Sequence, residues 1–146
     1  MMDMTQMRWA LVVIMACNAA LFFFGALQHA GVAFGPFHEP PITPAAIVET
    51  ICGLSLLSGA VVICGHSASK WRVALITNIV ALAGVLLGIG ALALGAGPRT
   101  ESNDTYHRIM LALIGTAFVI LLLRESVARR KEDSGQDSGP QAGARS

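Results

Sequence analysis

Four long apolar stretches, separated by short polar or proline- and glycine-rich segments, dominate the pattern of this chain. They cover about residues 9–28, 44–64, 71–95 and 106–123. An α-helix of about 20 residues crosses the ~30 Å hydrocarbon core of a bilayer, and each stretch is close to that length. The pattern therefore predicts an all-α integral membrane protein, built as a four-helix transmembrane bundle.

Prolines and glycines mark the interruptions between the apolar stretches. The segment 28–42 contains three prolines and two glycines, which exclude a continuous helix there. Thr43 followed by Pro44 is typical of a helix start, with Thr43 as the N-cap and Pro44 at the first helical position. Residues 65–70 and 97–104 are predicted to form the other two connections.

The composition agrees with a membrane protein. The chain is 54% hydrophobic and 13% charged, whereas a soluble domain has about 25% charged residues. We expect a single four-span transmembrane domain over residues 1–124. Residues 125–146 become rich in glycine and serine and cannot bury a core, so we expect them to form a disordered cytoplasmic tail.

The first apolar stretch has two other interpretations. The apolar region of a cleaved signal peptide has only about 7–15 residues, which is shorter than this run. A lipoprotein signal would use Cys17, preceded by Ile14, Met15 and Ala16, but the apolar run continues beyond the cysteine through residues 21–24. A membrane-spanning helix is therefore favoured over both.

The basic residues predict the orientation. Eight of the ten Lys and Arg residues fall on one side of the predicted spans: Arg8, Lys70, Arg72, Arg124, Arg129, Arg130, Lys131 and Arg145. Only Arg99 and Arg108 fall on the other side. Cytoplasmic loops carry the excess of Lys and Arg. We therefore expect a multi-pass protein of the cell (inner) membrane with both termini in the cytoplasm.

Small residues at four-residue spacing predict close packing between helices. Gly84 and Gly88 form a GxxxG pair, and Ser55 and Gly59 have the same spacing. We favour packing within one bundle, and the alternative is a homo-oligomer or a membrane-protein partner on the same residues. The lipid bilayer is the other expected partner. No basic face with interleaved aromatic residues is present, so we expect no nucleic acid partner.

Each predicted helix carries a polar group near the same depth. These residues are Asn18, Ser55, Ser58, Asn78 and Thr116. None of them ionises, so we interpret them as a layer of hydrogen bonds between helices, each contributing about 0.6 kcal/mol and fixing the register. The alternative is a polar pathway for a substrate or protons.

Ionisable residues gather at the predicted outer end. Glu49 lies about five residues into the second predicted helix, roughly 7–8 Å below the outer edge, where a carboxylate is costly and suggests a function. His29, His38, Glu39 and His107 are predicted nearby. Histidine and carboxylate can bind a substrate, protons or a divalent metal, and the spacing does not decide whether a metal binds. The competing interpretation is that Glu49 reaches the interface and the histidines are solvated.

The layout of residues 9–123 resembles that of small bacterial four-helix inner-membrane proteins of the DoxX-like group. This resemblance lies in the general plan and implies the fold alone. The size and the membrane glutamate are also similar to those of the small multidrug-resistance transporters. That family has its essential glutamate in the first helix, where this chain has Asn18.

Two hypotheses for the function remain. The favoured one is a non-enzymatic accessory or interaction protein, which predicts that Glu49→Gln is tolerated. The alternative is a small transporter or a metal- or redox-handling protein with its site around Glu49. An enzyme is less favoured, because neither outer loop can hold a catalytic domain and no catalytic or nucleotide motif is present. We expect no cofactor.

Overall fold

The described chain folds into four α-helices. The computed structural model describes residues 4–34, 40–66, 69–97 and 100–136. The helices are α1 (Met4–His29), α2 (Thr43–Cys64), α3 (Lys70–Ala93) and α4 (Glu101–Gln136). Each is long and apolar enough to cross a membrane. The predicted all-α architecture with four helices of membrane-spanning length is therefore confirmed.

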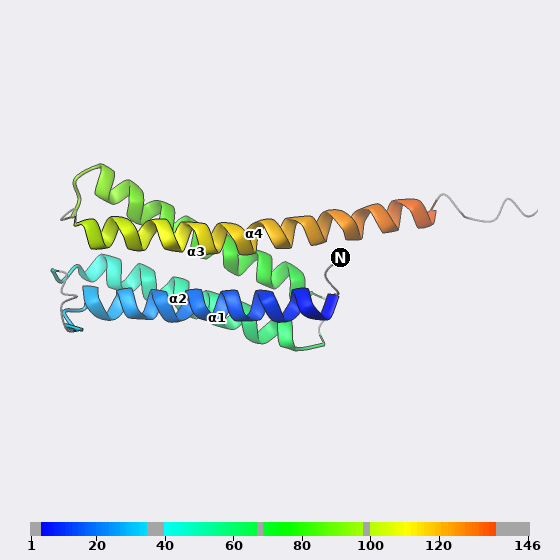
Figure 1. The fold of residues 1–146 in the computed structure, drawn as a ribbon, viewed down its shortest axis with the longest axis horizontal. Coiled ribbons are helices and arrows are strands. Elements are labelled where there is room, and N and C mark those ends of the chain that lie inside the picture. Colours follow the sequence, from blue (N-terminus) through cyan, green and yellow to red (C-terminus); the bar gives the residue numbers. More distant parts are fainter. Residues whose placement is uncertain (1–3, 35–39, 67–68, 98–99, 137–146) are drawn as a thin grey trace, which may run out of the picture.

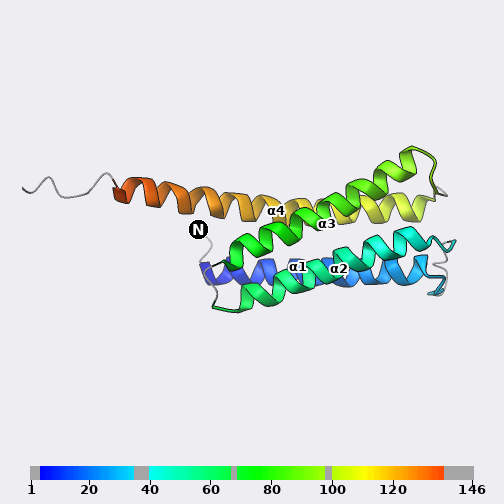
Figure 2. The same ribbon diagram turned by 180° about the vertical axis from the view of Figure 1, so that it is seen from behind.

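The helices run alternately up and down, as short connections require. Neighbouring pairs around the bundle are α1–α2, α2–α3, α3–α4 and α4–α1. We call the end at which α1 finishes the His29 end, and the opposite end, at which α3 begins, the Trp71 end. Figures 1 and 2 show that α3 runs obliquely, with its first turns level with α1 and α2 and its last turns on the far side of α4.

All four helices begin before their predicted positions, α1 at Met4 rather than at about residue 9 and α3 at Lys70 rather than at about residue 71. α2 starts at Thr43, but Ile42 is its N-cap and Thr43 forms no side-chain cap. The Ile42 carbonyl accepts the first helical bond from Ala46 N at 3.1 Å. α4 starts at Glu101, five residues before the predicted position, because Thr100 Oγ1 accepts a hydrogen bond from Asn103 N at 3.1 Å and caps the helix.

The C-terminal part of α4 corrects the predicted tail. The helix continues to Gln136, so residues 125–136 are helical rather than disordered, and α4 extends well beyond the other helices in Figure 1. Glu125 and Arg129 form an ion pair at 3.5 Å across one turn, which stabilises a helix. Residues 137–146 of the predicted tail lie outside the described residues.

Apolar side chains occupy both the interior and the outside of the bundle. Every helix contributes buried apolar side chains to the core. The large ones include Leu11, Met15, Phe22, Leu56, Ile63, Val85, Met110 and Ile114. Residues that point outward and are more than half exposed include Val13, Ile47, Leu54, Val61, Ile76, Val119 and Leu123. A bundle that is apolar outside as well as inside is suited to lipid rather than water.

Glycines in α2 and α3 lie against side chains of neighbouring helices. Gly59 contacts Thr77 of α3 and Met15 of α1, and Gly84 contacts Cys52 of α2. These small residues let helices approach closely inside this bundle. An additional partner or second copy on Gly84, Gly88, Ser55 and Gly59 stays a prediction.

Gly59→Ala is expected to destabilise the bundle by about 1–3 kcal/mol, the usual cost of overpacking. The added methyl group would overlap the Thr77 and Met15 side chains. Gly115→Ala is the matched control, because no atom lies within 4 Å of the added carbon. Thermal unfolding in detergent measures both variants. Equal melting temperatures would show that the α1–α2–α3 contact at Gly59 is not close.

Candidate functional site

A cavity of about 290 Å³ lies at the His29 end, where α3 diverges from α2. All four helices contribute to its walls. Most of the lining is apolar, from Phe22, Val48, Val85, Leu87 and Leu92 together with several alanines and glycines. Its polar groups are His29, Glu49, Asn103, Tyr106 and His107. An apolar cavity with a few converging polar groups is the usual form of a ligand site.

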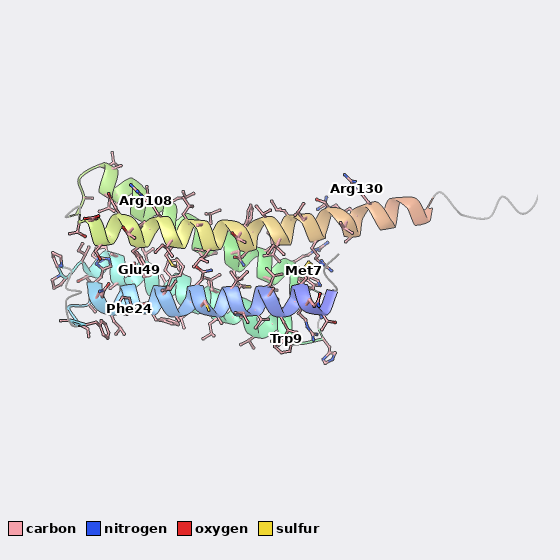
Figure 3. The ribbon with its side chains drawn as sticks, in the orientation of Figure 1. Met7, Trp9, Phe24, Glu49, Arg108 and Arg130 are labelled. Carbon is pink, nitrogen blue, oxygen red and sulfur yellow. The ribbon has the colours of Figure 1, made fainter. Side chains whose placement is uncertain are left out.

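Among the described residues, Glu49 is the only acidic one that lines this cavity. It lies near the start of α2, and Figure 3 shows its side chain directed into the bundle, between α2 and α4. The residue is only 7% exposed. Its Oε2 atom has no hydrogen-bond partner among the described residues. A buried carboxylate oxygen without a partner is costly, so it calls for a ligand or a water molecule.

His29 is the basic neighbour of Glu49. Its Nε2 atom lies 3.9 Å from Glu49 Oε1, and the residue is 6% exposed. The backbone fixes this position, because His29 O accepts a hydrogen bond from Ile42 N at 2.9 Å. That bond joins the last turn of α1 to the N-cap of α2. Oε1 is thus the carboxylate oxygen nearer to His29, and Oε2 is the one without a hydrogen-bond partner among the described residues.

Tyr106 brings α4 to the same carboxylate. Its hydroxyl donates to Leu21 O of α1 at 3.2 Å and also lies within hydrogen-bonding reach of Glu49. Gly25 makes room for both groups. A Cβ atom at Gly25 would lie 2.7 Å from the Tyr106 hydroxyl and 2.8 Å from both Glu49 oxygens. The absence of a side chain at Gly25 is therefore part of the site.

His107 forms the opposite wall. Its Nδ1 lies 2.9 Å from Asn103 O, so this nitrogen carries the proton when the ring is neutral, and Nε2 contacts Gly88 of α3. The Tyr106 and His107 rings meet edge to face, with centroids 5.4 Å apart. Neighbouring residues of α4 thus place an aromatic surface along the cavity.

The structure brings together three of the five ionisable residues predicted at this end. His29, Glu49 and His107 line one cavity, whereas His38 and Glu39 lie outside the described residues. Glu49 and His29 are buried, so in the structure neither is the solvated interface residue of the competing interpretation.

Sequence reasoning missed Gly25, Asn103 and Tyr106. The helical repeat could have indicated Gly25, because this residue precedes His29 by one turn and lies on the same face of α1. The same spacing relates Asn103 to His107. Tyr106 was considered only as the first residue of the shortest predicted helix.

The described residues offer few ligands for a metal ion. Within the described ranges, no three His, Cys, Asp or Glu side chains are close enough to share a metal ion. Structural and catalytic zinc sites use at least three protein ligands.

Four of the five residues of the predicted polar layer form hydrogen bonds with partners other than those predicted. Asn18 donates to Ile14 O at 3.0 Å, and Asn78 donates to Ala74 O at 2.9 Å. Ser58 and Thr116 are exposed and bond to Leu54 O and Ala112 O of their own helices, and Ser55 is half-buried. Among the described residues, none of these five groups bonds to another helix. Four of the donors, those of Asn18, Ser58, Asn78 and Thr116, instead reach the carbonyl one turn earlier, a local bond that polar side chains form in helices.

Asn78→Leu is expected to leave stability unchanged or slightly raised. Asn78 is 0% exposed and its Oδ1 atom has no hydrogen-bond partner among the described residues, so an apolar side chain of similar shape removes an uncompensated group. The melting temperature in detergent tests this. A large decrease would show that the amide oxygen is bonded across the bundle, as the sequence-based interpretation requires.

No family model matches the chain, and no curated protein or solved structure is significantly similar to it. The DoxX-like resemblance in layout therefore stays a prediction. The function has to be inferred from the cavity and its residues.

Proposed function

We propose that this chain is a membrane protein that binds a small lipophilic organic cation in the cavity at the His29 end. The observation that carries this proposal is that Glu49 lines an apolar cavity and that its buried Oε2 atom has no hydrogen-bond partner among the described residues. An organic cation offers the missing charge, and its apolar groups match the walls. The proposal keeps the position that the transporter or metal- and redox-handling alternative gave to the site, around Glu49, and differs from it in the class of ligand.

The size and lining of the cavity support a small ligand with aromatic or alkyl groups. About 290 Å³ is at the lower limit of the ~300–1,000 Å³ typical of ligand pockets. The rings of Phe22, Tyr106 and His107 line it. Aromatic faces attract organic cations by about 2 kcal/mol or more where water is excluded. Charge and aromatic contacts therefore favour the same class of ligand.

The distribution of basic residues supports an orientation with the His29 end outward, in the cell membrane. Arg8, Lys70, Arg72 and the arginines of the α4 extension lie toward the Trp71 end, whereas Arg108 is the basic residue of the first α4 turns. By the positive-inside rule the Trp71 end and both termini are cytoplasmic. The cavity then receives its ligand from the outer half of the membrane.

Isothermal titration of the purified protein with benzyltrimethylammonium tests the proposed function. This probe has a fixed positive charge and an aromatic ring. Neopentylbenzene, which has the same shape with carbon in place of nitrogen, is the matched neutral probe in a competition experiment. We expect saturable binding of the cation and at least about tenfold weaker binding of the neutral probe, equivalent to 1.4 kcal/mol.

Equal affinities for the two probes, or no saturable binding of the cation, would contradict the proposed function. A stable partner protein that co-purifies, combined with no cation binding, would support the accessory-protein hypothesis instead. That hypothesis treats the cavity as a space between loosely packed helices.

A further inference from the structure

A second cavity, of about 690 Å³, lies at the Trp71 end between the start of α3 and the extension of α4. Its lining is Ser69, Trp71 and Arg72 from the α3 start and Arg124, Glu125, Ala128 and Arg129 from α4. Three arginines and one glutamate leave a formal charge of +2 on this lining. The site is at the opposite end of the bundle from Glu49 and independent of the proposed function.

Two of the arginines are held in place by other side chains. The Arg124 guanidinium lies over the Trp71 ring, 4.3 Å from its centroid, a cation–π contact between α4 and α3. Glu125 lies 3.5 Å from both Arg124 and Arg129. One carboxylate thus orients two guanidinium groups and cannot neutralise both. Arg72 adds a further exposed positive charge from α3.

The backbone adds a fixed positive field. The first N–H groups of a helix have no partner within it, and its N-terminus attracts anions. Trp71 and Arg72 belong to the first turn of α3, which therefore presents such groups beside the three arginines. Guanidinium groups bind phosphate oxygens in a bidentate manner, so this combination fits a phosphate.

The position along the bundle identifies the source of the phosphate. The last residues of the apolar part of α4 are Leu121–Leu123, immediately before Arg124. Trp71 is a residue type that marks the boundary between hydrocarbon and headgroups. The basic cavity therefore lies where lipid phosphates lie. The outward-facing leucines next to it, such as Leu122 and Leu123, offer a surface for acyl chains.

We propose that the cavity formed by Trp71, Arg72, Arg124 and Arg129 is a binding site for the phosphate of an anionic phospholipid headgroup. The lipid phosphate accepts hydrogen bonds from the arginines, and its acyl chains lie along α3 and α4. Occupation would join the start of α3 to α4 on the membrane surface.

Brominated lipids, which quench tryptophan fluorescence at short range, test this site directly. The chain has two tryptophans, so Trp9→Phe leaves Trp71 as the single reporter. The full chain is reconstituted in phosphatidylcholine vesicles containing either brominated phosphatidylglycerol or the same fraction of brominated phosphatidylcholine. We expect stronger quenching by phosphatidylglycerol, equivalent to about fivefold or higher preference, or about 1 kcal/mol.

Arg72→Gln combined with Arg129→Gln should reduce this preference to near one. Arg108→Gln, an exposed arginine of α4 near the His29 end, should leave it unchanged. The preference of the parent protein should persist at about 0.5 M salt, where the Debye length is only about 4 Å and diffuse attraction is screened.

Three results would overturn the proposal. Equal quenching by the two lipids would show that no site selects the anionic headgroup. Loss of the preference at high salt would show diffuse attraction only. Loss of the preference on addition of inorganic phosphate at constant ionic strength would assign the cavity to free phosphate rather than to lipid.

Discussion

Glu49→Gln is expected to weaken benzyltrimethylammonium binding by about thirtyfold or more. Removing one partner of a buried charge pair costs about 2 kcal/mol or more, and 1.4 kcal/mol corresponds to tenfold. Glutamine has nearly the same shape as glutamate, so the packing against Gly25 and Tyr106 is preserved. Titration calorimetry gives the affinity, and a melting curve of the same sample verifies the fold.

Glu101→Gln is the matched control for this variant. Glu101 is an exposed acidic residue in the first turn of α4 and does not line the cavity. It should leave the affinity within about twofold, which is about 0.4 kcal/mol. If Glu49→Gln binds the cation as tightly as the parent protein, the carboxylate does not hold the ligand and the proposed function fails.

Gly25→Ala is expected to weaken cation binding by about tenfold, or 1.4 kcal/mol. The new Cβ would lie 2.7–2.8 Å from the Tyr106 hydroxyl and the Glu49 oxygens, closer than carbon and oxygen atoms can pack. Both polar groups must therefore move. They are the ends of side chains, so α1 itself can keep its position. Binding should consequently decrease more than stability.

Gly115→Ala in α4 provides the comparison for this variant, because nothing lies within 4 Å of the added carbon. Alanine is the better helix former by about 1 kcal/mol in both cases, so the difference between the variants reports on the site. Unchanged affinity in Gly25→Ala would mean that Glu49 and Tyr106 do not position the ligand.

The number of helices and their approximate limits were predictable because hydropathy over about 20 residues is a strong signal. The ends were less predictable, since local bonds decide them. Thr100 caps α4 with a side-chain bond to Asn103 N, which starts the helix within a polar segment that hydropathy excluded. Likewise, the pair between Glu125 and Arg129 belongs to a helix where composition suggested a tail.

The buried carboxylate and its histidine were predictable for a different reason. Counting residues from the helix ends gives the depth of Glu49 and His29, and both lie near the same end of the bundle. Depth does not give the rotation of a helix about its axis. The contact between Gly25 and Tyr106 depends on this rotation and on α4 packing against α1, neither of which the hydropathy pattern contains.

The difference between the depth of a residue and the rotation of its helix also explains the correction to the polar layer. Asn18 and Ser58 were assigned to one layer by depth alone, but Asn18 is 1% exposed and Ser58 faces outward. A hydroxyl group on the outside of an apolar bundle finds its acceptor in its own helix, as Ser58 does at Leu54 O. Groups at equal depth therefore need not meet.

Modification of Glu49 by a hydrophobic carbodiimide, with and without the cation, tests most directly whether the ligand occupies this cavity. Such reagents enter apolar regions and attach to carboxyl groups, and mass spectrometry of the peptide that contains Glu49 measures the product. We expect benzyltrimethylammonium to protect Glu49, with a concentration dependence equal to that of the calorimetric binding curve. Modification at the same rate with saturating cation would show that the ligand binds elsewhere and would contradict the proposed site.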